Sequence, residues 1–280
     1  MGDPLSKLAG GVAVISGAGS GIGAGLARQA GAAGMRVVLA DVDESAAQAV
    51  SAEIPDSAAM RVDVAQPEEL DRLAREVAER FGPVRLLVNN AGIETLGFAW
   101  EIPAERWEQT LRVNLHGVIH GVRAFVPGML ASGEECWIAN VASIAALGTM
   151  PTQSAYMLTK HAVQSFNECL YLEMQAKGAP IHVSSVIPGW VKSAIFDPAD
   201  DAGESDFATR QRAVMRGAMA AQGMDAGEAA RIILEGIAAG DFWVSTQPEM
   251  TRELAAARAA FLTALVPPEL TDETRAILES

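Results

Sequence analysis

The sequence predicts an α/β fold, a doubly wound parallel sheet of about seven strands with helices on both faces. Two observations lead to it. Apolar, β-branched runs of strand length recur through the first two thirds of the chain, and helix-length segments separate them. Strands buried on both faces read as continuous apolar runs, which parallel sheets favour, and repeated alternation of strand and helix indicates a doubly wound sheet.

The elements follow in a regular order. Residues 66–82 predict a helix, because their apolar side chains recur at helical spacing. Further helices are expected at 226–239 and in the terminal segment 249–266, after a mobile excursion at 193–224. Without a linker or a repeat, residues 1–280 are interpreted as one domain with a C-terminal helical extension at about 249–280. The predicted strands are 11–16, 36–41, 58–63, 85–90, 136–141, 181–187 and 241–246.

The charge and composition of the chain limit the kinds of partner that it is expected to bind. The formal net charge of −14 argues against nucleic acids and anionic membranes, and an uncharged stretch at 8–27 holds seven glycines, which suits a folded turn better than a membrane anchor. Cys136 and Cys169 lack CxxC spacing, so a disulfide framework is not expected. His116 and His120 are four residues apart but no Asp or Glu joins them in a metal-binding motif, so a metal site is not expected either. A small-molecule partner and a cytoplasmic location are therefore expected.

A glycine-rich turn, "SGAGSGIG" at 16–23, follows the first predicted strand and opens the first helix. Glycines let the backbone approach a ligand closely, and a helix N-terminus offers free N–H groups to a phosphate. About twenty residues later Asp41 ends the second strand, where a carboxylate accepts hydrogen bonds from a ribose 2′-hydroxyl and repels a 2′-phosphate. The sequence thus favours NAD over NADP, and Arg36 opens that strand too far back to reverse the preference.

Tyr156 and Lys160 are four residues apart, so on a helix they share one face. A nearby cation favours the phenolate, and the pair is predicted to exchange a proton closer to neutral pH than a free tyrosine does.

With these motifs in order, the chain resembles the short-chain dehydrogenase/reductase family, in its compact single-domain type, from about Lys7 to Ile195. The glycine turn is similar to TGxxxGxG with Ser16 for Thr, and Tyr156 and Lys160 match YxxxK. The segments "NNAG" at 89–92 and "PGWVKS" at 188–193 resemble two further family motifs. The resemblance implies a Rossmann-like fold and an NAD-dependent alcohol dehydrogenase or ketone reductase.

The resemblance also implies the role of each site residue. Tyr156 would act as general acid and base, Lys160 would lower its pKa and hold the nicotinamide ribose, and Ser143 would hydrogen-bond the substrate oxygen. Asn114 would hold a water that links the lysine to solvent. The implied cofactor-binding residues, besides Tyr156 and Lys160, are Ser16, Gly17, Ser20, Gly21, Ile22, Gly23, Asp41, Asp63, Val64, Asn90, Ala91, Gly92, Pro188, Gly189, Val191 and Ser193.

Residues expected around the substrate form a largely apolar set with adaptable methionines, which predicts a medium to large apolar or aromatic secondary alcohol, ring-shaped compounds included. The alternatives are a cofactor-binding sensor or scaffold without turnover, and a lyase or epimerase of the same family. The expected substrate residues are Glu94, Leu147, Met150, Gln153, Trp190, Phe196, Met215 and Met219.

A homotetramer is expected, with a homodimer as the alternative. In the family that the chain resembles, the helices around Asn114 and Tyr156 pack against a neighbouring subunit. Here those helices carry apolar residues predicted to face outward, which are Leu111, Val118, Val122, Phe166 and Leu170.

Overall fold

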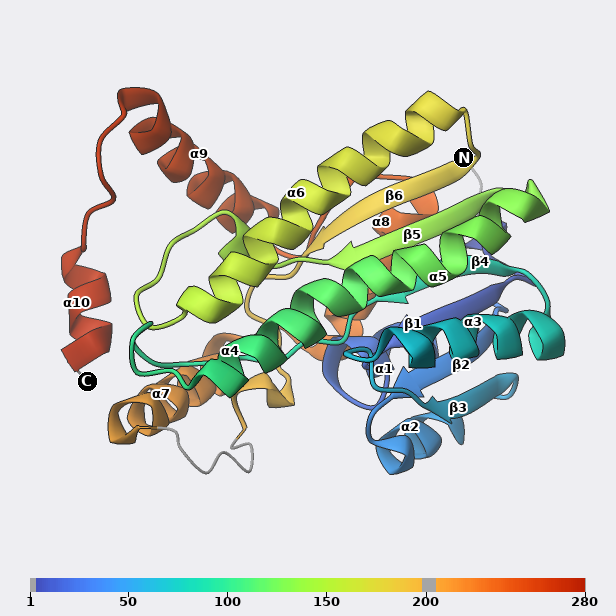
Figure 1. The fold of residues 1–280 in the computed structure, drawn as a ribbon, viewed down its shortest axis with the longest axis horizontal. Helices are drawn as coiled ribbons and strands as arrows, with labels where there is room; N and C mark the ends of the chain where they lie inside the picture. The colour runs from blue at the N-terminus through green and yellow to red at the C-terminus, as the bar shows by residue number, and fades with distance from the viewer. Residues whose placement is uncertain (1–3, 198–204, 280) are drawn as a thin grey trace.

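A computed structural model describes residues 4–197 and 205–279. Seven parallel strands form one sheet in the order β3-β2-β1-β4-β5-β6-β7, which confirms the predicted fold (Figure 1). Three strands match their predicted bounds, and each of the others differs by one or two residues at one or both ends. The strands are β1 (Val12–Ser16), β2 (Arg36–Asp41), β3 (Ser57–Arg61), β4 (Val84–Asn89), β5 (Cys136–Val141), β6 (Ile181–Ile187) and β7 (Trp243–Ser245).

Helices connect the strands. A π-helical turn, Arg112–His116, joins α4 directly to α5, and short 3-10 turns occur at Pro4–Lys7, Ile144–Ala146 and Ala194–Phe196. The α-helices are α1 (Gly21–Ala32), α2 (Glu44–Ser51), α3 (Pro67–Phe81), α4 (Ala104–Leu111), α5 (Gly117–Ser132), α6 (Ser154–Lys177), α7 (Asp206–Gln222), α8 (Ala226–Ala239), α9 (Pro248–Ala264) and α10 (Asp272–Glu279).

Both faces of the sheet are covered, which explains why β1 is apolar along most of its length. Along β1, Ala13 and Ile15 pack into a core with α1 and α8, while Val12 and Val14 pack into a second core with α3, α5 and α6. Figure 1 shows α3, α5 and α6 in front of the sheet. A strand buried on both faces leaves no solvent side for polar residues.

Helix α7 lies inside the segment that the sequence analysis assigned to a mobile excursion, so that assignment is wrong for 206–222. Its N-cap is Ser205, whose side chain accepts a hydrogen bond from the N–H of Ala208. The buried side of the helix carries Gln211 and Arg212 beside Ala208, and these polar residues hide the apolar periodicity on which the prediction depends. Residues 198–204 of the predicted excursion lie outside the described residues.

The outward orientation predicted for three residues of α5 and α6 is also wrong. Val118, Val122 and Leu170 are at most 8% exposed and belong to the cores between these helices and their neighbours. Leu111 and Phe166 are partly buried. The most apolar side of each helix faces inward, because burial there removes the most apolar surface from water.

A chain of buried amides crosses the sheet behind α6. Asn89 Nδ2 donates to Asn140 Oδ1 at 2.8 Å, and Asn140 Nδ2 donates to Asn167 Oδ1 at 2.8 Å. Asn167 Nδ2 donates to Ser185 Oγ at 3.0 Å, and this hydroxyl donates to Gln164 Oε1 at 2.6 Å. Since unpaired buried polar groups are costly, the chain fixes the position of α6 relative to β4, β5 and β6.

The C-terminal region extends from the body. Within α9 no described residue is buried, and α10 returns to α7, where Gln211 Nε2 donates to the carbonyl oxygen of Ile277 at 2.9 Å (Figure 1). Across the described ranges, no helix has both the length and the apolar composition needed to cross a membrane.

Candidate active site

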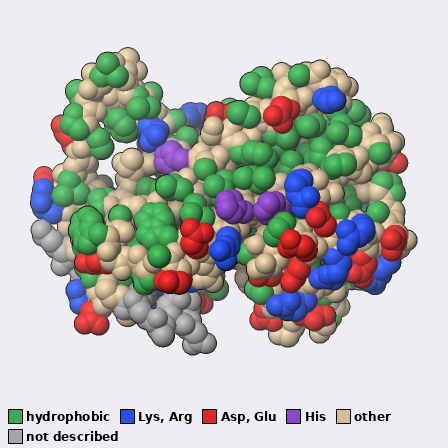
Figure 2. All heavy atoms as spheres, in the orientation of Figure 1, with side chains coloured by type: hydrophobic (Ala, Val, Ile, Leu, Met, Phe, Trp, Pro, Cys, Tyr) green, Lys and Arg blue, Asp and Glu red, His purple; other side chains and the backbone are tan. Residues whose placement is uncertain are grey.

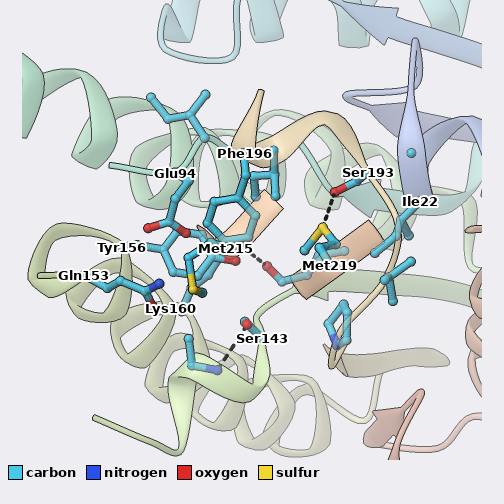
Figure 3. A pocket seen from close by; sticks show the side chains of 18 of the residues that line it. Ile22, Glu94, Ser143, Gln153, Tyr156, Lys160, Ser193, Phe196, Met215 and Met219 are labelled. Carbon is cyan, nitrogen blue, oxygen red and sulfur yellow. Dashed lines mark hydrogen bonds between the residues drawn. The ribbon is translucent and has the colours of Figure 1, made fainter. Parts of the chain in front are cut away.

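A cleft of about 1300 Å³ opens at the carboxyl ends of the parallel strands and brings together the glycine turn, Asp41, Ser143, Tyr156 and Lys160. The cleft lies where the strand order reverses, because β1 has β2 on one side and β4 on the other. In open α/β sheets this is the place where ligands bind. Figure 3 shows the part of the cleft around Tyr156.

The glycine turn requires its glycines. Gly17 has a φ of +64°, and a Cβ there would lie 2.8 Å from Ala91 Cα, while a Cβ on Gly23 would collide with the carbonyl oxygen of Gly17. Helix α1 begins at Gly21, and within the described part of the chain its N-cap, Ser20, makes no side-chain capping bond. The first N–H groups of α1 therefore remain available to a phosphate in the cleft.

Asp41 is held at the edge of the glycine turn. Its Oδ2 accepts a hydrogen bond from the N–H of Gly19 at 2.8 Å, and its Oδ1 accepts one from Asp43 at 3.0 Å. Arg36, at the other end of β2, pairs with Asp56 at 2.8 Å. The cleft therefore has a carboxylate, and not an arginine of β2, where a ribose 2′ position would lie.

Ser16 and Asn90 tie the glycine turn to the end of β4. Ser16 Oγ accepts hydrogen bonds from the N–H groups of Asn90 and Ala91 at 3.0 and 3.2 Å. Asn90 Nδ2 donates to the carbonyl oxygens of Ser16 and Gly17 at 3.0 and 3.1 Å. Ser16 and Gly23 are buried beneath the turn and support it, whereas all the other residues proposed for the cofactor line the cleft.

Tyr156 and Lys160 lie near the start of α6 and share one face, as their spacing predicts. Lys160 Nζ donates to the carbonyl oxygen of Val141 at 2.8 Å and lies 5.5 Å from the centroid of the Tyr156 ring. Ser143, which follows β5, hydrogen-bonds Tyr156 and accepts a bond from the N–H of Ala145 at 3.1 Å. The phenol and the serine hydroxyl are thus paired at the cleft wall.

Burial raises the pKa of Tyr156 well above its ordinary value, the charge of Glu94 raises it further, and the hydrogen bond with Ser143 opposes the rise. The expected lowering of this pKa by Lys160 is therefore not found, because burial dominates and Lys160 is not among the groups that shift it. Burial also lowers the pKa of Lys160 to about 8, against the opposing charge of Glu94.

Asn114 lies in the π-helical turn and is fully buried. Its Oδ1 accepts from the N–H of Ile93 at 2.8 Å, and its Nδ2 donates to Ile93 O at 2.9 Å and to Thr159 Oγ1 at 3.2 Å. A Cβ on Gly92 would lie 3.5 Å from Asn114 Oδ1 and 3.7 Å from Lys160 Nζ, so both side chains approach the same glycine. The described geometry gives Asn114 a part in holding the segment that follows β4.

Seven of the eight predicted substrate residues line the cleft, which are Glu94, Met150, Gln153, Trp190, Phe196, Met215 and Met219. Leu147 does not, because it ends the 3-10 turn Ile144–Ala146, and Ile144 and Ala145 take its place in the wall. Residues of the cleft that were not predicted from the sequence include Arg106 of α4, Arg212 of α7, and Thr274 and Ile277 of α10. Ser205 is a residue type that favours the N-cap of a helix, and a helix predicted to begin there would have included Arg212.

Comparison with known proteins places the chain in a family. The family described as short chain dehydrogenase matches residues 11–203. SadH of Mycobacterium tuberculosis, named as an oxidoreductase, is 37% identical over 212 residues, which is 73% of this chain and 75% of SadH. A protein of the same organism named 3-alpha-(or 20-beta)-hydroxysteroid dehydrogenase is 36% identical over 192 residues, 68% of this chain and 73% of that protein.

Solved structures agree. A short-chain dehydrogenase/reductase from Burkholderia phymatum in complex with NAD has a TM-score of 0.90 and 33% identity, covering 94% of this chain and 98% of its own. A metagenomic short-chain oxidoreductase in complex with NADP has a TM-score of 0.62 and 31% identity, covering 66% of this chain and 85% of its own. Among these similar proteins, one is therefore found with NAD and another with NADP.

Proposed function

This chain belongs to the short-chain dehydrogenase family, and we propose that it interconverts a secondary alcohol and a ketone with NAD as the hydride carrier. The observation that carries the proposal is the pairing of Tyr156 with Ser143, beside Lys160, in the same cleft as the glycine turn and Asp41. Such a cleft can hold a dinucleotide and a carbinol next to a proton donor.

The residues present fit a nicotinamide dinucleotide. Gly17 leaves room for close backbone approach, the N-terminus of α1 suits the pyrophosphate, and the carboxylate of Asp41 suits a ribose with a free 2′-hydroxyl. When bound, this cofactor gives or takes the hydride. Asp41 supports NAD over NADP, and Ser193, in the wall of the cleft, is proposed to bind the carboxamide end.

The chain's own residues would transfer the proton to and from the substrate oxygen. Tyr156 donates it to the ketone oxygen in reduction and removes it from the alcohol in oxidation, since its hydroxyl is in the cleft and paired with Ser143. Ser143 donates a hydrogen bond to the same oxygen and stabilises the charge that develops there. Lys160 holds its ammonium beside the phenol ring, and Asn114 is proposed to support a water that exchanges protons with Lys160.

The substrate is proposed to be a medium to large apolar or aromatic secondary alcohol. Support comes from the apolar side chains of Met150, Phe196, Met215 and Met219, three of which are adaptable methionines. The relative named as a hydroxysteroid dehydrogenase is consistent with a bulky substrate.

The proposal is tested by measuring NAD reduction with a panel of apolar secondary alcohols. Tyr156→Phe is expected to lower kcat/KM by a factor of roughly 100 or more, because it removes the general acid and base, while NADH still binds. Tyr171→Phe is the matched control, because the other tyrosine packs its ring 5.0 Å from that of Phe242, and its hydroxyl has no proposed role. Equal loss in both variants, or turnover that survives in Tyr156→Phe, would contradict the assignment.

Two alternatives remain from the sequence analysis. A cofactor-binding sensor or scaffold would bind NADH without turning over any alcohol in the panel. A lyase or epimerase would convert its substrate with no net change in NADH. The retained Tyr156, Lys160 and Ser143 favour the dehydrogenase over the sensor.

A homotetramer and a cytoplasmic location complete the proposal. Leu158 and Leu172 of α6 are 49% and 62% exposed, and Figure 2 shows apolar side chains gathered over α5 and α6. An exposed apolar face of this kind supports association of copies, with a homodimer as the alternative.

A further inference from the structure

Glu94 is a carboxyl group in the cleft wall to which the proposed reaction gives no task. It lies in the segment after β4 and is 3% exposed. Its Oε1 is buried, and no group among the described residues hydrogen-bonds it. Since a buried oxygen without a partner costs free energy, its presence calls for a specific explanation.

The backbone around Glu94 is held in place by α4. Arg106 Nη2 donates to the carbonyl oxygen of Glu94 at 3.1 Å, and Arg106 Nε donates to Thr95 Oγ1 at 3.1 Å. The hydroxyls of Thr95 and Thr110 are 2.7 Å apart and hydrogen-bonded. These bonds hold the backbone of the segment in place, so the side chain of Glu94 starts from a fixed point in the cleft wall.

The carboxyl of Glu94 points toward Tyr156 and Phe196 in the part of the cleft proposed for the substrate (Figure 3). Met215 lies close by, and most other predicted substrate residues are apolar. In a mostly apolar pocket, a few placed polar groups fix the orientation of the ligand and provide specificity. Glu94 has the position for that role.

Burial raises the pKa of Glu94 to about 8, although the charge of Arg212, a hydrogen bond from the backbone N–H of Thr95 and the charges of Lys160 and Arg106 oppose the rise. Near neutral pH the carboxyl is therefore largely protonated. A protonated carboxyl keeps an oxygen that accepts a hydrogen bond and can also donate one.

We propose that Glu94 is a specificity-determining residue, which binds a hydroxyl or amino group that the substrate carries in addition to its reacting carbinol. The inference rests on the proposed dehydrogenase function and narrows its substrate class from apolar alcohols to alcohols with a second hydrogen-bond donor. A site built to hydrogen-bond a substrate group rejects the analogue that lacks it, because the buried partner is then left unpaired.

The test measures binding of two alcohols of similar shape, 1-indanol and 1,2-indanediol, to the protein saturated with NADH. An alcohol cannot be reduced further, so the complex is stable and calorimetry gives its dissociation constant without turnover. The wild type is expected to bind the diol at least about tenfold more tightly than 1-indanol. Glu94→Leu is expected to abolish this preference, because it replaces the carboxyl with an apolar group of similar size.

Two further variants separate the role of Glu94 from a general effect on folding. Glu94→Gln keeps an oxygen acceptor and is expected to retain most of the preference for the diol. Glu101→Leu changes an exposed carboxyl a few residues along the chain and is expected to behave as the wild type. Equal affinity of the wild type for both alcohols, undetectable binding of both included, would overturn the inference, as would a preference that survives in Glu94→Leu.

The outcomes also separate this inference from the proposed function. Oxidation of 1-indanol that depends on Tyr156, without a preference for the diol, would overturn the inference alone. A diol preference that depends on Glu94, in a protein that oxidises neither alcohol, would support the role of Glu94 in binding and count against the dehydrogenase.

Discussion

At the scale of single residues, burial in the cleft disfavours the charged forms of Tyr156 and Lys160. Tyr156 keeps its proton because its phenol is buried, and Lys160 loses part of its hold on a proton for the same reason. A phenol that retains its proton is ready to donate it to a ketone oxygen, whereas oxidation first requires its removal. Once Glu94 ionises above its pKa of about 8, its charge raises the pKa of both groups, which couples the proposed substrate contact to the proton donor.

Asp41 carries the residue-scale prediction on cofactor choice. Asp41→Ala is expected to weaken NAD binding about tenfold or more, since a hydrogen bond to a charged group contributes about 1.5–3 kcal/mol. The preference for NAD over NADP is expected to shrink because the negative charge that repels a 2′-phosphate is gone. Fluorescence titration with NADH and NADPH measures both effects.

Arg36→Ala is the control for Asp41, because Arg36 is on the same strand and pairs with Asp56 at the opposite end. It is expected to leave the ratio of the two affinities unchanged. A protein that prefers NADPH before any substitution would contradict the role given to Asp41.

At the scale of elements, the position of α6 decides whether Tyr156 and Lys160 meet Ser143. The buried amides of Asn89, Asn140 and Asn167 join β4, β5 and α6, so this contact depends on side chains outside the cleft. The π-helical turn between α4 and α5 adds a second brace, since it presents Asn114 to the segment after β4. The site is thus held by polar bonds between elements as well as by apolar packing.

Asn140→Leu tests the contribution of the buried amides of Asn89, Asn140 and Asn167. The substitution leaves Asn89 Nδ2 and Asn167 Oδ1 without their bonds in the core, which is expected to lower the free energy of unfolding by about 3 kcal/mol. Denaturant unfolding followed by circular dichroism gives the value. Gln175→Leu changes an exposed amide on α6 and is expected to stay within about 0.5 kcal/mol of the wild type. Similar stabilities for the two variants would contradict a stabilising role for the buried amides.

At the scale of the whole molecule, apolar and charged side chains gather in different regions of the face shown in Figure 2. Apolar side chains gather over α5 and α6, whereas charged side chains gather over α2, α3 and β3 (Figure 2). The two cores on either side of the sheet use most of the apolar residues of the strands, so the exposed apolar positions on α6 are surplus to folding. A surface of that kind is typical of an interface.

The proposed homotetramer predicts a sedimenting mass four times that of one chain. Leu158→Glu combined with Leu172→Glu is expected to lower that mass, because buried charges would oppose association through α6. Leu262→Glu, at a position 54% exposed on α9, tests whether the effect belongs to α6. A wild type that sediments as a monomer would contradict the proposal, and a mass of two chains would favour the homodimer.

Local patterns in the sequence were sufficient for the sheet, the glycine turn and the helix that pairs Tyr156 with Lys160. Apolar runs, glycine-rich turns and helical spacing can each be recognised from residues close together in the chain, and β2, β5 and β6 were predicted to the residue. The family resemblance, and not these local patterns, supplied most of the residues proposed for the cofactor, nearly all of which line the cleft. Reasoning from local patterns failed for α7, where Gln211 and Arg212 lie on the buried side, and for Val118, Val122 and Leu170, whose inward orientation depends on neighbouring elements.

The sequence by itself thus determined the order of the elements and the residue types that could bind a dinucleotide and move a proton. Only the tertiary structure decided the electrostatics of the site, because the pKa of a buried group depends on how much water its neighbours exclude. Burial reversed the expected effect on Tyr156 and raised the pKa of Glu94. The placement of Arg212 and Ile277 in the same cleft was likewise a tertiary result, since α7 and α10 meet the active site only when the chain is folded.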